Sequence, residues 1–100
     1  MAKPTYSLAT VQSSVNALQA KAFTASAING GQGELALTLA EMIATINSAT
    51  VSDCHKTMAN NSIKGAFQDV YHLTTPLSDV AYVKFCLHSQ SKVVVSFKRK

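Results

Sequence analysis

Hydrophobic and polar residues alternate along the last twenty residues of the chain. Segments 81–87 and 92–98 both have a period of two, which predicts two strands with distinct faces. The apolar faces are expected to hold Ala81, Val83, Phe85 and Leu87 in one strand and Val93, Val95 and Phe97 in the other. The polar faces carry Tyr82, Lys84, Ser96 and Lys98, with Val94 as the main exception. Such a hairpin buries one face and presents phenol and ammonium groups on the other, where they suit a polyanion.

The first half of the chain has helical periodicity instead. An apolar residue recurs every three or four positions over 7–20 after Ser7, which is suited to an N-cap. An extended piece at 21–24 and a short helix that stops at Gly30-Gly31 are expected next. Thr38 and Glu41 form a capping box that opens a second clear helix, and this helix is expected to end between 47 and 50.

After residue 51 the pattern returns to that of strands. Segments 53–58 and 67–73 are predicted strands, and a turn cluster at 59–62 joins them. Helices followed by a run of antiparallel strands are typical of an α+β architecture. We therefore expect N-terminal helices packed on an antiparallel β-sheet that is formed mainly by residues 51–100. One hundred residues fit a single domain, 1–100.

The positive charge is concentrated in the second half of the chain. Residues 1–50 hold two lysines and two glutamates, whereas residues 51–100 hold seven bases and three acids, which accounts for the whole net charge of +4. This asymmetry predicts a basic patch for nucleic acid or for an acidic protein. The sequence has no apolar tract of membrane-spanning length and no signal-peptide pattern, so we expect a cytoplasmic protein with no membrane partner.

The sequence lacks the familiar motifs of cofactor and metal sites. A P-loop, a Rossmann glycine pattern, H-E-x-x-H and G-x-S-x-G are all absent. Cys54-His55 and Cys86-Leu87-His88 hold ligand-type residues, but adjacent strand residues point to opposite faces and two ligands do not make a structural zinc site. No metal and no cofactor is predicted, and both cysteines are expected to be free and buried.

Four segments of the second half resemble the MqsR family, the motility quorum-sensing regulator toxins. The family pattern D-F-Y-K-S-M, W-Q-D-V-Y, V-Y-L-K and I-V-S-F-K corresponds here to DCHKTM at 53–58, FQDVY at 67–71, VAYVK at 80–84 and VVVSFK at 93–98. The match is close over 50–100 and loose over 1–49. The resemblance implies a RelE-like ribonuclease fold and a type II toxin–antitoxin toxin. Such a toxin is a metal-independent mRNA interferase that prefers sites beginning with GC, such as GCU, and arrests translation and growth.

The resemblance also assigns candidate site residues. The active-site residues proposed for the family fall on Lys56, Gln68, Tyr82 and Lys98. RNA carries its own nucleophile, the 2′-hydroxyl, so the enzyme must activate it, stabilise the phosphoryl charge and protonate the 5′-oxygen. The two lysines suit the electrostatic role and proton transfer by one of them, Tyr82 suits a general acid or phosphate donor, and Gln68 suits orientation of the phosphate or a base. The expected contacts to the RNA backbone are Lys84, Arg99 and Lys100.

The chain departs from the family pattern at its histidines. His55 stands in place of an aromatic tyrosine, and the segment 72–74 replaces Arg-Pro-Arg, which removes two guanidiniums that grip phosphate. An extra residue also separates Val80 from Tyr82. A histidine near the site is an alternative proton carrier, but His55 is expected to point away from Lys56 if the strand is regular.

Two alternatives without catalysis fit the basic charge. One is a module that binds RNA without cleaving it, and the other is a domain whose basic sheet edge docks an acidic partner. Each polar residue of the sheet, considered alone, could also be an ordinary solvent-exposed position.

The resemblance implies two partners: mRNA and a cognate antitoxin that combines a zinc-binding domain with a helix-turn-helix domain.

Overall fold

The helices lie on one side of a four-stranded antiparallel sheet in the computed structural model, which describes residues 3–100. The strands run in the order β1 (Cys54–Ala59), β2 (Phe67–Thr74), β3 (Val80–Phe85) and β4 (Val94–Arg99). The helices are α1 (Leu8–Leu18), α2 (Ala25–Ile28) and α3 (Leu39–Asn47), with short helical turns η1 (Gln19–Ala22), η2 (Asn29–Glu34) and η3 (Val51–Asp53). The predicted α+β architecture is confirmed.

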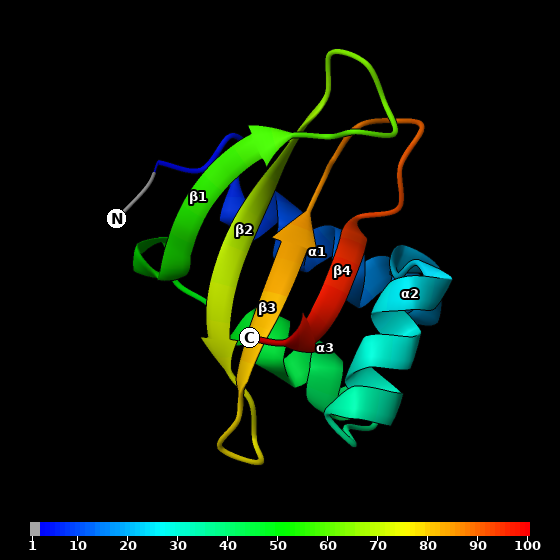
Figure 1. Cartoon of the computed structure of the whole chain (residues 1–100), viewed down its shortest axis with the longest axis vertical. Coiled ribbons are helices and arrows are strands. Elements are labelled where there is room, and N and C mark those ends of the chain that lie inside the picture. Colours follow the sequence, from blue (N-terminus) through cyan, green and yellow to red (C-terminus); the bar gives the residue numbers. More distant parts are fainter. Residues whose placement is uncertain (1–2) are drawn as a thin grey trace.

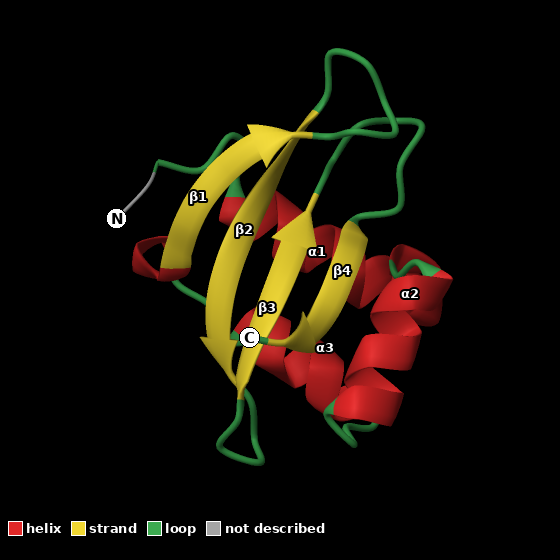
Figure 2. Ribbon diagram, viewed as in Figure 1, coloured by secondary structure: helices red, strands yellow, loops and turns green. Residues whose placement is uncertain are grey.

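The two faces of the sheet differ in what covers them. Figures 1 and 2 show α1 and α3 behind the sheet and α2 beside β4, so that the face toward the viewer carries none of the described helices. The core between the sheet and the helices is apolar, and its fully buried members include Val11, Val15, Met42, Ile46, Val83, Phe85 and Phe97. No helix in residues 3–100 is long and apolar enough to cross a membrane.

The helix starts follow the capping residues of the sequence. Ser7 Oγ accepts a hydrogen bond from the Thr10 amide at the start of α1. At the start of α3, Thr38 and Glu41 exchange side-chain to backbone hydrogen bonds of 3.1 and 2.9 Å, which makes a complete capping box. Both helix starts are therefore determined locally, by residues that satisfy the free amides of the first turn.

The helix that was expected to stop at Gly30-Gly31 continues past these glycines, so this expectation is wrong. The chain from α2 runs on into η2, a turn of π-helix. The glycines instead permit close packing: a side chain on Gly30 would overlap the Phe97 carbonyl of β4, and one on Gly31 would overlap the Met42 side chain. Of the segment 21–24 that was expected to be extended, residues 21 and 22 belong to η1, whereas Phe23 and Thr24 are extended and Phe23 makes a parallel bridge to Val94.

Strict alternation fails at a bulge in β4. Phe85 pairs with Val94 and Lys84 pairs with Ser96, so Val95 is an extra residue in the ladder. The bulge leaves Val94 fully buried and Val95 partly exposed, which reverses the prediction for these two valines. After the bulge, Ser96 and Lys98 point to the uncovered face as expected.

The close approach of η2 to β4 predicts that only one of two glycine substitutions in η2 destabilises the fold. Gly30→Ala should lower the free energy of unfolding by about 1–3 kcal/mol, because the new methyl overlaps the backbone of β4. Gly33→Ala is the matched control, since its methyl would meet no atom within 4 Å. Urea unfolding monitored by circular dichroism measures both changes. Equal losses in the two variants would contradict the proposed packing.

Candidate active site

The polar residues of the sheet gather on the face that the helices leave uncovered, here called the open face. Residues directly opposite each other on antiparallel strands share a face. Tyr82 of β3 is opposite His72 of β2 and opposite Lys98 of β4. These residues therefore form one row across three neighbouring strands.

A second row lies two residues further along the strands. Lys56 pairs with Val70, Val70 with Lys84, and Lys84 with Ser96. Two residues along a strand cover about 6.6 Å, so the two rows are neighbours. Gln68 and Val70 are two residues apart on β2, so their side chains lie on the same face. All four candidate active-site residues, Lys56, Gln68, Tyr82 and Lys98, consequently lie on the open face.

Tyr82 is at the centre of this arrangement. The ammonium groups of Lys84 and Lys98 each lie 5.6 Å from the centroid of its ring. The imidazole of His72 lies on its other side, with ring centroids 5.8 Å apart. The phenol is thus flanked by two cations and one titratable ring, which is the kind of environment that binds a phosphate group.

The other tyrosines do not reach the open face. Tyr71 lies in the core with its hydroxyl buried and without a hydrogen-bond partner, and burial raises its pKa to about 12. The hydroxyl of Tyr6 donates to the Phe67 carbonyl at 2.7 Å. Tyr82 is therefore the tyrosine that is placed to contact a ligand there.

Gln68 is set apart from the row that contains Tyr82. It is four residues from His72 along β2, which corresponds to about 13 Å. It is also 5% exposed, unlike Lys56 and Lys98, which are exposed. The structure brings Gln68 close to the row of Lys56 and Lys84, and away from the phenol.

A β-bulge in β1 brings a histidine to the same face. Cys54 pairs with Tyr71 while Lys56 pairs with Val70, so His55 is the extra residue. Its ring stacks on that of His72, with centroids 4.2 Å apart and planes 22° from parallel. The expectation that His55 points away from Lys56 is wrong, because the bulge interrupts the alternation on which it rested.

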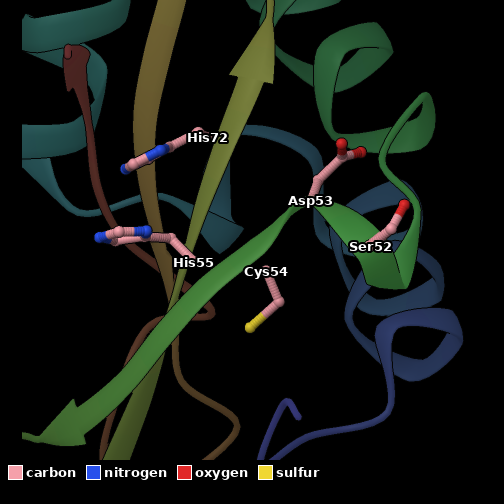
Figure 3. A pocket seen from close by; sticks show the side chains of 5 residues that line it. All are labelled: Ser52, Asp53, Cys54, His55 and His72. Atoms are coloured by element: carbon pink, nitrogen blue, oxygen red, sulfur yellow. The ribbon is translucent and has the colours of Figure 1, made fainter. Parts of the chain in front are cut away.

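The two histidines line an open pocket at the start of β1. The pocket has a volume of about 360 Å³ and is lined by Ser52, Asp53, Cys54, His55 and His72. Figure 3 shows the two imidazoles side by side and pointing the same way, while the Cys54 thiol points elsewhere.

Cys54 and Cys86 are free and buried, as predicted. The described residues contain no group of three or more histidine, cysteine or acidic side chains that could hold a metal ion.

The acidic residues of the chain are used in structural contacts. Each of the five accepts a hydrogen bond from the protein: Glu34, Glu41, Asp53, Asp69 and Asp79. Asp69 is 1% exposed and binds the backbone amides of Thr5 and Tyr6 at 2.8 Å each. Within residues 3–100 the one ion pair joins Arg99 to Asp79, so the lysines of the open face remain available to an anion.

The residues expected to contact the RNA backbone divide between the two faces. Arg99 pairs with Ala81, whose side chain is in the core, and its guanidinium binds Asp79 at 2.6 Å and the Glu34 carbonyl at 3.2 Å. The Lys100 amide donates to the Val80 carbonyl at 2.9 Å, which extends the ladder and returns Lys100 to the open face. Lys84 and Lys100 therefore share the face of Lys98, and Arg99 does not.

Sequence reasoning missed the place of His72 in this site. The sequence left the role of His72 open, as the replacement of an arginine and as one of several histidines that could carry a proton, although His72 is four residues from Gln68 and so on the same face of a predicted strand. The pKa of His72 is lowered by burial first, then by the positive charges of His55, Lys100 and Lys56. His72 is therefore held toward its neutral form, which can accept a proton.

The lowered pKa of His72 predicts how stability depends on pH. The unfolded chain, with a histidine pKa of about 6.5, binds this proton before the folded chain does, so stability falls as the pH drops below that value. His72→Gln removes this contribution, and the parent should lose stability relative to it between about pH 7.5 and pH 5. Urea unfolding across this range measures the difference. A constant difference, or a His72 pKa above 6.5 by NMR, would contradict the prediction.

Comparison with known proteins supports the resemblance seen in the sequence. The profile of the family described as "Motility quorum-sensing regulator, toxin of MqsA" matches residues 3–99. No curated protein and no solved structure matches the chain. The matched range spans nearly the whole chain and includes both rows of the open face. The chain therefore belongs to the MqsR family of toxins, and is a toxin of a toxin–antitoxin module.

Proposed function

We propose that this toxin is an mRNA interferase, an endoribonuclease that cleaves mRNA without a metal ion and so arrests translation and growth in the cytoplasm. The observation that carries the proposal is the row of His72, Tyr82 and Lys98 on the open face, with the Lys84 ammonium 5.6 Å from the centroid of the Tyr82 ring. Cationic and phenolic groups that no carboxylate neutralises are suited to the phosphodiester of RNA.

The proposed reaction uses the 2′-hydroxyl of the RNA as the nucleophile. A bond forms between O2′ and phosphorus, and the bond from phosphorus to O5′ breaks, which leaves a 2′,3′-cyclic phosphate and a 5′-hydroxyl. Lys98 and Lys56 stabilise the negative charge that grows on the phosphoryl oxygens. Tyr82 of β3 is directly opposite Lys98 of β4. Its hydroxyl donates the proton that the leaving O5′ requires.

The remaining residues of the open face serve to hold the RNA. Lys84 and Lys100 provide charge for phosphates on either side of the cleaved bond. Gln68 lies beside the row of Lys56 and Lys84 and orients the nucleotide next to that bond. A preference for sites that begin with GC, such as GCU, is part of the proposal, and mapping of cut sites on total mRNA tests it.

The proposed protein partner is an antitoxin of the MqsA type. The family description names its members as toxins of MqsA. We expect the antitoxin to combine a zinc-binding N-terminal domain with a helix-turn-helix DNA-binding domain. Relief of growth arrest on co-expression is the corresponding test in cells.

The catalytic roles predict a large loss of activity from each of two single substitutions. Lys98→Ala and Tyr82→Phe should each lower the rate of cleavage on the order of a hundredfold or more, because each removes a group that acts on the transition state. Cleavage of a defined RNA in EDTA, with analysis of the product ends, measures the effect. Lys64→Ala is the matched control, since Lys64 is exposed in the loop between β1 and β2.

Cleavage and gel-shift measurements on the same RNA separate this function from the two alternatives without catalysis. A gel shift that weakens with salt, without cleavage, would indicate an RNA-binding module. Absence of both effects would favour a protein-docking domain. Cleavage by Lys98→Ala and Tyr82→Phe at the parent rate, with the fold intact, would contradict the assigned roles.

A further inference from the structure

No step of the reaction proposed so far uses the stacked rings of His55 and His72. The bulge in β1 exposes the ring of His55 on the open face and places it 4.2 Å from the ring of His72. The site lacks an assigned group that accepts the proton of the attacking 2′-hydroxyl. Histidine is the side chain whose ordinary titration suits this task near neutral pH.

The position of His72 relative to Tyr82 fits such a role. In an in-line displacement the attacking and leaving oxygens lie on opposite sides of the phosphorus. His72 and Lys98 are on the strands that flank β3, and Tyr82 lies between them at 5.8 Å from the His72 ring. A phosphate held between the His72 ring and the Tyr82 hydroxyl therefore has an imidazole on the side of β2 and the phenol, with the Lys98 ammonium beyond it, on the side of β4.

We propose that His72 is the general base of the cleavage reaction and that His55 is its positioning residue. A ring nitrogen of neutral His72 takes the proton from the 2′-hydroxyl as the O2′–phosphorus bond forms. Tyr82 gives a proton to O5′ as the phosphorus–O5′ bond breaks. Transfer of the proton from His72 to solvent and of a solvent proton to Tyr82 restores both groups. The proposal rests on the RNA cleavage proposed above.

The surroundings of His72 favour its neutral form from several elements. His55 and Lys56 face it from β1, Tyr82 and then Lys98 from β3 and β4, and Lys100 from the C-terminus. Asp53 of η3 lines the same pocket, and its carboxylate accepts hydrogen bonds from the Thr50 amide and hydroxyl. The charges nearest to the imidazole are therefore mainly positive.

Stacking also links the protonation of the two rings. Two imidazoles in contact disfavour the state in which both carry a positive charge, so a charged His55 ring lowers the pKa of His72. His55 thereby restricts the ring orientation of His72 and opposes its protonation. A purely structural stack would lack the second effect, which the rate of cleavage as a function of pH can detect.

The test is the dependence of cleavage on pH in the parent and three variants. For the parent, kcat/KM should rise with pH to a plateau, with an inflection below about 6.5. His72→Gln should abolish this acidic limb and lower the rate about a hundredfold or more at pH 7, while a gel shift shows RNA binding within about threefold of the parent. His88→Gln is the matched control, because His88 lies in the loop between β3 and β4, and it should keep the parent profile.

His55→Phe tests the positioning role while His72 remains in place. Phenylalanine retains a flat ring over His72 but carries no charge, so the acidic limb should move to higher pH with most of the plateau rate retained. An unmoved limb in this variant would overturn the role of His55, and a normal rate and pH profile in His72→Gln would overturn the role of His72. A His72→Gln variant that loses only RNA binding would also overturn the role of His72 as the base. That result would mean that His55 and His72 hold the RNA by stacking on one of its bases.

Failure of this inference is distinguishable from failure of the proposed function. If the parent cleaves RNA and Lys98→Ala does not, the enzyme is established, and the His72→Gln profile alone decides whether the base is a histidine. If the parent cleaves no RNA under any condition of pH, both proposals are overturned.

Discussion

Burial of one face of the sheet is the constraint on which the open face depends. Val83, Phe85 and Phe97 are inaccessible to solvent in the core between the sheet and the helices, so the strands can pair only in the register that keeps these residues inside. A slip of one residue would turn Lys84 and Lys98 into the core, where an unpaired charge costs several kcal/mol. The alignment of His72, Tyr82 and Lys98 in one row is thus a consequence of hydrophobic packing on the opposite side of the sheet.

The two bulges modify this arrangement in different ways. In β4 the extra residue Val95 allows Val94 to remain in the core and restores the alternation before Lys98. In β1 the extra residue His55 brings two consecutive side chains to the open face, where a regular strand would bring one. Bulges of this kind re-aim side chains next to functional sites. The stack of His55 on His72 exists because of this one inserted residue.

Local patterns predicted most of the helices and strands and the shared face of Tyr82, Lys84 and Lys98, because hydrophobic periodicity, capping residues and alternation along a strand are local properties. Lys98 and Tyr82 could be assigned to one face from alternation alone, and the same rule, applied further, separates Arg99 from them. The bulge at His55 could not be predicted, because it depends on the pairing of β1 with β2. The packing of Gly30 against β4 also depends on a contact between distant segments, so a glycine signal that usually ends a helix had another cause.

We therefore expect one row of three residues, His72, Tyr82 and Lys98, to hold the cleaved phosphate. A crystal structure of the protein with a short RNA whose 2′-hydroxyls are methylated tests this assignment most directly, because such an RNA binds without being cleaved. We predict a phosphate between His72 and Tyr82, with His72 on the side of the O2′ atom and with Tyr82 and Lys98 on the far side of the phosphorus. RNA bound to the helix-covered side, or a phosphate that contacts none of these three residues, would contradict it.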